Sequence, residues 1–139
     1  MKPFTDLNAA RNFHGHLGPN LIIGIKAGNY AKKVLNPESC FQLHAEVHCP
    51  GKPPISCIID GVQLSTGCSM GKGNIAHVIS DNTVKMIFTN TQTGQSLTLE
   101  IFGDFIEKTM RWFKELGEEE CSKRTWEADD SEVFRACTN

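Results

Sequence analysis

The chain has 139 residues, which suits one domain and is short for two. Hydrophobic residues make up 40% and charged residues 22%, a balance that excludes disordered and fibrous proteins. The net charge is −2, from 14 Lys+Arg and 16 Asp+Glu, and no basic stripe alternates with aromatic residues. We therefore expect no nucleic-acid partner. No apolar run approaches the ~20 residues of a membrane-spanning helix, and the N-terminus has no apolar signal core. We expect a cytoplasmic protein without a membrane partner.

The hydrophobic pattern predicts an α+β fold in a single domain over residues 1–139, with an antiparallel or mixed sheet of about four to five strands and flanking helices. A core over about residues 10–117 carries the motifs, and a helical tail follows over about 118–139. The predicted helices cover residues 20–35, 57–66, a long stretch from 103, and a weaker one at 131–136. The predicted strands cover residues 41–49, 76–80, 83–90 and 95–102, with a turn at 81–82 joining the second to the third.

The strand over 41–49 alternates apolar and polar side chains, which is typical of a strand with one buried face. Its polar face carries His44, Glu46 and His48. Such a face can line a metal pocket, but a solvated polar face is the more common case, and we favour it for the two histidines. Glu46 lies mid-strand, where it could support a metal ligand or accept a proton.

Two histidines lie close together in residues 13–19, Phe-His-Gly-His-Leu-Gly-Pro, immediately before a predicted helix. Gly15 lets the backbone turn sharply between His14 and His16, so both imidazoles can point to one ion. The alternative is a pair of histidines that cap or pack at the start of the helix. On this motif alone the two interpretations are evenly matched, since a metal site needs more than two ligands.

The chain has six cysteines. Because we expect it not to be secreted, they are more typical of free thiols or metal ligands than of disulfides. Cys57 and Cys68 bracket the short predicted helix, which is about 15 Å long, so they can share an ion only if the chain folds back after Gly67. The alternative is that both are small buried apolar residues. Asp60 lies one turn beyond Cys57 on the same helix face, where it could support the site or be a surface charge.

Residues 67–74, Gly-Cys-Ser-Met-Gly-Lys-Gly-Asn, form a glycine-rich loop that lacks the spacing of a nucleotide-binding loop. Gly71, Lys72 and Gly73 could bind a small anion through backbone amides and the lysine charge. A tight structural turn is the somewhat favoured alternative.

The two motifs resemble those of the FmdE family, which is named after a component of formylmethanofuran dehydrogenase. Residues 13–20 resemble its Phe-His-Gly-His-x-Cys-Pro-Gly motif, and residues 57–74 resemble its second block, a Cys-x-x-Asp helix followed by Gly-Cys-Thr-x-Gly-Lys-Gly-Asn. The chain differs at Gly18 and Asn20, where the family has Cys and Gly. It also has no paired cysteines near its end, so we predict no C-terminal zinc ribbon.

The resemblance implies an α+β homodimer that holds a metal ion between the histidine motif and the two cysteines. Its candidate ligands here are His14, His16, Cys57 and Cys68. A mixed nitrogen and sulfur set suits Zn²⁺ best, and Ni²⁺ is the second choice.

The sequence therefore predicts a small metal-binding protein whose metal lies beside the loop of Gly71, Lys72 and Gly73. One alternative is a metal-dependent enzyme with an open coordination position, acting on a small anionic substrate with Glu46 or Asp60 as base. The other is an accessory or regulatory component of a redox complex, in which the metal is structural and the aromatic helix from residue 103 binds a partner.

Overall fold

The centre of the fold is a mixed five-stranded sheet. The computed structural model describes residues 1–139, and the strand order is β2-β1-β3-β4-β5. Strands β1 and β2 are parallel, whereas the other three neighbouring pairs are antiparallel. The bounds are β1 Leu43–Cys49, β2 Ile75–Ile79, β3 Lys85–Asn90, β4 Ser96–Ile101 and β5 Phe134–Thr138. The predicted α+β class is confirmed, and so is the predicted strand number.

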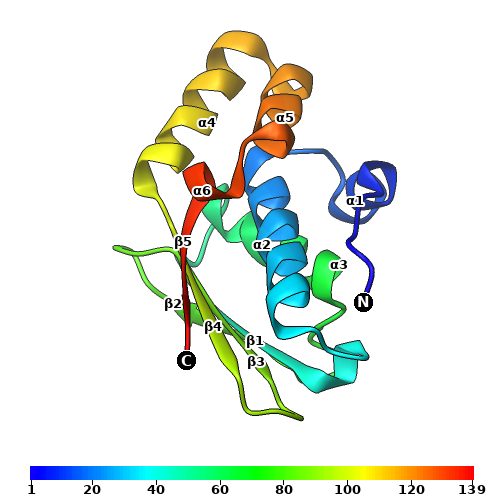
Figure 1. The fold of residues 1–139 in the computed structure, drawn as a ribbon. Coiled ribbons are helices and arrows are strands. Elements are labelled where there is room, and N and C mark those ends of the chain that lie inside the picture. The colour runs from blue at the N-terminus through cyan, green and yellow to red at the C-terminus, as the bar shows by residue number, and fades with distance from the viewer.

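Six α-helices complete the fold. They are α1 Leu7–His14, α2 Pro19–Leu35, α3 Ile58–Thr66, α4 Gly103–Leu116, α5 Glu118–Glu127 and α6 Asp130–Val133, with short 3-10 turns at Cys40–Gln42 and Ile55–Cys57. Helices α2 and α3 cover one face of the sheet, and α4 and α5 stand together beyond one end of it (Figure 1). None of the helices combines the length and the apolar character needed to cross a bilayer.

The alternation predicted for β1 is present in the structure. Leu43, Ala45, Val47 and Cys49 are buried under the helices, whereas the residues between them are partly exposed on the other face. Buried side chains of α2, α3, β3 and β4 complete this core. One face of the sheet is therefore packed against helices and the other is open.

The structure differs from the sequence predictions in one helix that was wrong, one helix that was not predicted, and the placing of two strands whose pairing the sequence left open. The helix predicted at 131–136 ends at Val133, and residues 134–138 form β5, because the free edge of β4 offers a full ladder to this segment. Helix α1 was not predicted; Asp6 caps it by accepting from Ala9 N–H, and Gly15 ends it with φ 100°. The strands at 75–79 and 85–90 are not neighbours, because β1 lies between them.

Helices α2 and α3 cross at glycines. A Cβ atom on Gly24 would lie 2.1 Å from the carbonyl oxygen of Ile58, and one on Gly61 would lie 2.1 Å from the carbonyl oxygen of Leu21. The two backbones are therefore in direct contact at this point. This contact fixes the first turn of α3 against the first turns of α2, just after the segment that carries the histidines.

Candidate metal site

The two histidines of the motif lie side by side where α1 meets α2. His14 is the last residue of α1 rather than a loop residue, and His16 follows the left-handed Gly15. The ring centroids of His14 and His16 are 4.9 Å apart, with the rings tilted by 43°. The side chain of His14 is 10% exposed, whereas that of His16 is 56% exposed. The pair therefore has one imidazole inside the protein surface and one facing solvent.

Asp60 holds the ring of His14. Its Oδ2 atom lies 2.6 Å from His14 Nδ1, a distance typical of a charge-assisted hydrogen bond. Asp60 lies in the first turn of α3, which the glycine contact with α2 keeps in place. When a carboxylate accepts from Nδ1–H, the lone pair of Nε2 is left for a metal or a proton. Asp60 therefore lies against one of the two motif histidines.

Glu118 holds the second histidine and the loop around it. Its Oε1 atom lies 3.3 Å from His16 Nδ1 and accepts a 2.8 Å hydrogen bond from Leu17 N–H. Ser122, one turn later in α5, donates from its hydroxyl to the carbonyl of Leu17 at 3.3 Å. Helix α5 therefore binds both backbone groups of Leu17, its N–H through Glu118 and its carbonyl through Ser122. Sequence reasoning did not find Glu118. It lies 101 residues from Leu17, and no motif links the two segments.

The two predicted cysteine ligands lie at opposite ends of α3. Cys57 immediately precedes the helix on the Asp60 side, and burial, with the nearby charge of Asp60, raises the pKa of its thiol. Cys68 follows the other end, fully buried, with its sulfur 3.6 Å from the carbonyl of Leu43. A nine-residue helix is roughly 14 Å long, so the thiols are far apart.

The four predicted ligands are therefore not brought together. The chain does not fold back after Gly67, since Thr66 Oγ1 accepts from the amide of Cys68 and the thiol packs under β1. No group of three or more His, Cys, Asp or Glu side chains stands close enough to hold a metal ion. The structure brings together the two imidazoles, and Cys57 lies at the end of α3 that also carries Asp60.

The glycine-rich loop follows the Cys68 end of α3, and its amides are partly used within the loop. The amides of Lys72 and Gly73 both donate to the carbonyl of Ser69, at 3.2 and 3.1 Å, and the Lys72 ammonium lies 3.3 Å from Ser69 Oγ. A pocket of about 190 Å³ separates this loop from Phe13 at the end of α1. Lys72 is thus the group of the loop that is best placed to meet an anion.

Glu46 lies away from the histidine pair. It is on the open face of the sheet, where its Oε1 atom is 2.5 Å from Nε2 of His48. The histidine pair is on the helical side of the fold, at the junction of α1 and α2. Glu46 therefore does not support the ring of His14 or His16, because the sheet stands between them.

Cys49 gives the protein a specific response to alkaline pH. Its thiol is fully buried at the end of β1, and burial raises its pKa from 9.0 to about 11. Between pH 9 and 11 the unfolded chain binds fewer protons at this thiol than the folded chain, so the free energy of unfolding falls as pH rises. Urea titrations on both sides of this window should show the fall, and Cys49→Ala should show a smaller one. An equal fall in both proteins would contradict this assignment.

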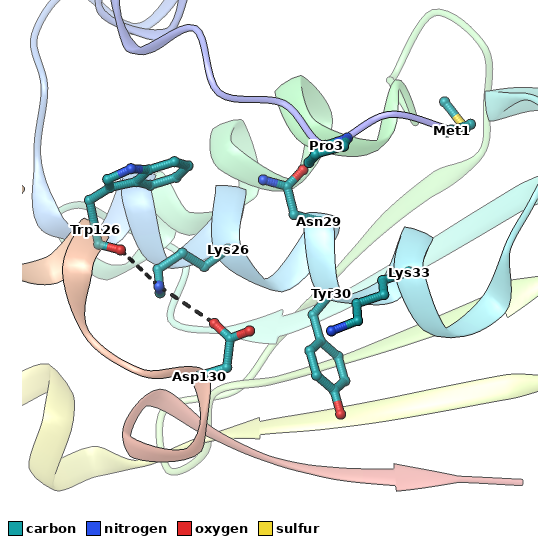
Figure 2. Close-up of a pocket in the computed structure, with 8 residues that line it drawn as sticks. All are labelled: Met1, Pro3, Lys26, Asn29, Tyr30, Lys33, Trp126 and Asp130. Carbon is teal, nitrogen blue, oxygen red and sulfur yellow. Dashed lines mark hydrogen bonds and ion pairs between the residues drawn. The ribbon is translucent and has the colours of Figure 1, made fainter.

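A larger pocket, of about 390 Å³, opens between the N-terminal segment, α2 and the end of α5 (Figure 2). Lys26 lines this pocket, but its ammonium group already has three partners within the chain. Its ammonium donates to the carbonyls of Trp126 and Ala128, at 3.0 and 2.8 Å, and lies 3.5 Å from Asp130 Oδ1. These contacts fasten the C-terminal segment to α2, and they leave Lys26 no free charge for a ligand.

Comparison with known proteins yields one family and one curated relative. Residues 13–138 match the family described as "FmdE, Molybdenum formylmethanofuran dehydrogenase operon". A protein of Archaeoglobus fulgidus, described as a probable S-adenosyl-L-methionine-binding protein, is 29% identical over 75 residues. That match covers 50% of this chain and 19% of the relative, so the chain corresponds to a small part of that protein.

Proposed function

The chain belongs to the FmdE family, and we propose that it is a metal-binding accessory protein of a formylmethanofuran dehydrogenase-type system. The single observation that carries the metal assignment is the pair of imidazoles at 4.9 Å, each with a carboxylate on Nδ1. The carboxylates occupy Nδ1 of both rings, and we assign Nε2 of His14 and of His16 to one ion. Metal-ligating histidines usually have such a carboxylate behind them.

The proposed ligand set is His14, His16 and Cys57. Cys57 has to move towards the two imidazoles when the ion binds, because the three side chains do not stand close enough to hold an ion in this structure. Cys57 is preferred to Cys68 because it lies at the end of α3 that carries Asp60, and because Cys68 is buried under β1. Two imidazoles and one thiolate suit Zn²⁺ best and Ni²⁺ next. The ion would supply a positive charge and a fourth position for water or a small anion. Since the pKa of Cys57 is raised, binding has to displace a proton from it and should strengthen as pH rises.

A second candidate function is a metal-dependent enzyme for a small anionic substrate. The observation that favours it is the 190 Å³ pocket beside Lys72, between the glycine-rich loop and Phe13. Three protein ligands leave a coordination position open to such an anion, whereas four ligands close it. The number of protein ligands therefore separates the two functions.

We also propose that the protein is a homodimer, as the family resemblance implies. Nothing in the arrangement of the histidine pair requires a second chain, so the metal assignment and the homodimer can be tested separately.

The metal assignment is tested by elemental analysis after reconstitution with Zn²⁺ or Ni²⁺ and removal of excess ion. We expect about one equivalent per chain. Cys57→Ser should lose most of the ion at neutral pH, whereas Cys68→Ser, the matched control at the other end of α3, should retain it. A protein that retains neither metal would overturn the proposal, as would equal loss in both variants.

A further inference from the structure

A pocket lies between α1 and α5, next to the segment that carries the motif histidines. Its volume is about 490 Å³, within the range of roughly 300 to 1,000 Å³ that is typical of small-molecule sites. Leu17 and Ser122 line it and are almost fully buried, and the hydroxyl of Ser122 donates to the carbonyl of Leu17. The docking of α5 therefore fixes the floor of the pocket, and the two helices form its walls.

One end of this pocket is apolar. Leu7 of α1 and Trp126 of α5 line it, and both pack, partly buried, against the small core cluster of α1, α2 and the segment between them. The indole of Trp126 offers a flat surface on which an aromatic or aliphatic group can pack. This end therefore suits the apolar part of a ligand.

The start of α5 places two carboxylates at the other end of the pocket. Glu118 and Glu119 line it, and Trp126 follows Glu119 by seven residues, about 10 Å along the helix. Glu118 uses Oε1 for the N–H of Leu17 and the ring of His16, and its Oε2 atom has no partner. Glu119 takes part in no ion pair. Both carboxylates can therefore accept from a cationic group.

Lys123 follows Glu119 by one helical turn but does not pair with it. The next two residues at the same spacing, Glu120 and Arg124, form an ion pair at 3.1 Å. Lys123 and Glu119 instead both line the pocket, and neither has an ion-pair partner. An i,i+4 pair of opposite charges that does not close leaves both charges for a ligand.

Arg11 supplies a second cation from the α1 wall. It lies one turn after Leu7, towards the histidine segment that Glu118 binds, so it stands at the charged end of the pocket. Its guanidinium has one side-chain partner, Asn8 Oδ1 at 3.2 Å, and no ion pair. A guanidinium can bind a carboxylate through two parallel N–H donors. The charged end therefore offers two cations and two carboxylates.

Charges of both signs beside an apolar surface match a small zwitterion with an apolar substituent. We propose that this pocket binds a ligand of the α-amino acid class. Its carboxylate binds Arg11 and Lys123, and its ammonium binds Glu119 and Oε2 of Glu118. Its side chain packs on Trp126. The site needs no metal ion, so this inference goes beyond the metal assignment and is independent of it.

The site is tested by ¹⁵N-edited NMR of the labelled wild type, with L-phenylalanine as the probe and no metal added. The indole N–H signal of Trp126 should shift saturably, whereas that of Trp112, on α4 and outside the pocket, should not move. Two matched probes each lack one charge: 2-phenylethylamine has no carboxylate, and 3-phenylpropanoate has no ammonium. Both should bind at least about tenfold more weakly than L-phenylalanine.

Two variants assign the charges of the pocket. Arg11→Gln should raise the Kd of L-phenylalanine about tenfold without weakening 2-phenylethylamine, which has no carboxylate to lose a partner. Glu119→Gln should likewise raise the Kd of L-phenylalanine without weakening 3-phenylpropanoate. Glu120→Gln is the matched control, because Glu120 lies outside the pocket and pairs with Arg124. The spectra themselves show whether each variant is folded.

Every other outcome overturns the inference. A Trp126 signal that does not respond to L-phenylalanine removes the site. Equal affinities for the three probes leave an apolar pocket and contradict a zwitterionic ligand. Wild-type affinity in both Arg11→Gln and Glu119→Gln places the binding charges elsewhere. An equal shift of the two indole signals indicates unspecific binding.

Discussion

Gly24→Ala should destabilise the protein by about 3 kcal/mol, close to the largest effect expected of adding one methyl group to a packed interior. The new Cβ would lie 2.1 Å from the carbonyl oxygen of Ile58 and 2.9 Å from the Cα atom of Gly61. Both are backbone atoms, so no side chain can rotate away, and α3 has to shift. At a helix position with free space, Gly→Ala would stabilise the protein by up to about 1 kcal/mol. A loss of stability in Gly24→Ala would therefore indicate a steric clash with α3.

Guanidinium chloride unfolding of Gly24→Ala measures this loss, with Gly103→Ala as the matched control. Gly103 is an exposed residue at the start of α4, and a Cβ there would have nothing within 4 Å. We expect that control to be neutral or slightly stabilised. If Gly24→Ala unfolded at the same denaturant concentration as the wild type, α2 and α3 could not cross as closely as described. The link from that crossing to the position of Asp60 would then be lost.

His14→Ala should remove the bound ion, and Asp60→Asn should weaken Zn²⁺ binding by roughly 10 to 100-fold. The first change deletes a ligand. The second retains the ligand but loses the carboxylate, 2.6 Å from Nδ1, that orients the ring. Competition with a chromophoric chelator measures both affinities at one pH.

The matched control for Asp60→Asn is Glu46→Gln. Glu46 also lies against a histidine ring, at 2.5 Å from His48, but on the open face of the sheet. We expect no change in zinc affinity there. Equal weakening in the two variants would mean that the effect comes from the loss of any acidic charge, and it would contradict the specific role of Asp60.

The elements predicted correctly are those whose hydrophobic pattern lies within their own residues. The alternation in residues 41–49 predicted β1, and the apolar spacing in residues 20–35 predicted α2. Helix α1 has only eight residues, and its signals are the caps Asp6 and Gly15 rather than a long periodic run. Strand β5 depends on the edge that β4 offers, and no window of residues 131–138 contains that information.

The same distinction explains which parts of the site were predicted. His14 and Asp60 stand in recognisable motifs, and the structure joins them although 46 residues separate them. Glu118 stands in a run of three acidic residues, and only the docking of α5 selects it to bind the histidine segment. The distance of Cys68 from the histidines depends on the direction of the chain after Gly67. Glycine permits either direction, and in the structure Cys68 lies under β1.

The central claim is that the imidazoles of His14 and His16 and the thiolate of Cys57 hold the ion. X-ray absorption at the zinc edge of the reconstituted protein tests it most directly, because it counts nitrogen and sulfur ligands separately. We predict two imidazoles at about 2.0–2.1 Å and one sulfur at about 2.3 Å, with the sulfur lost in Cys57→Ser. A spectrum with two or more sulfurs, or without imidazole scattering, would contradict this ligand set.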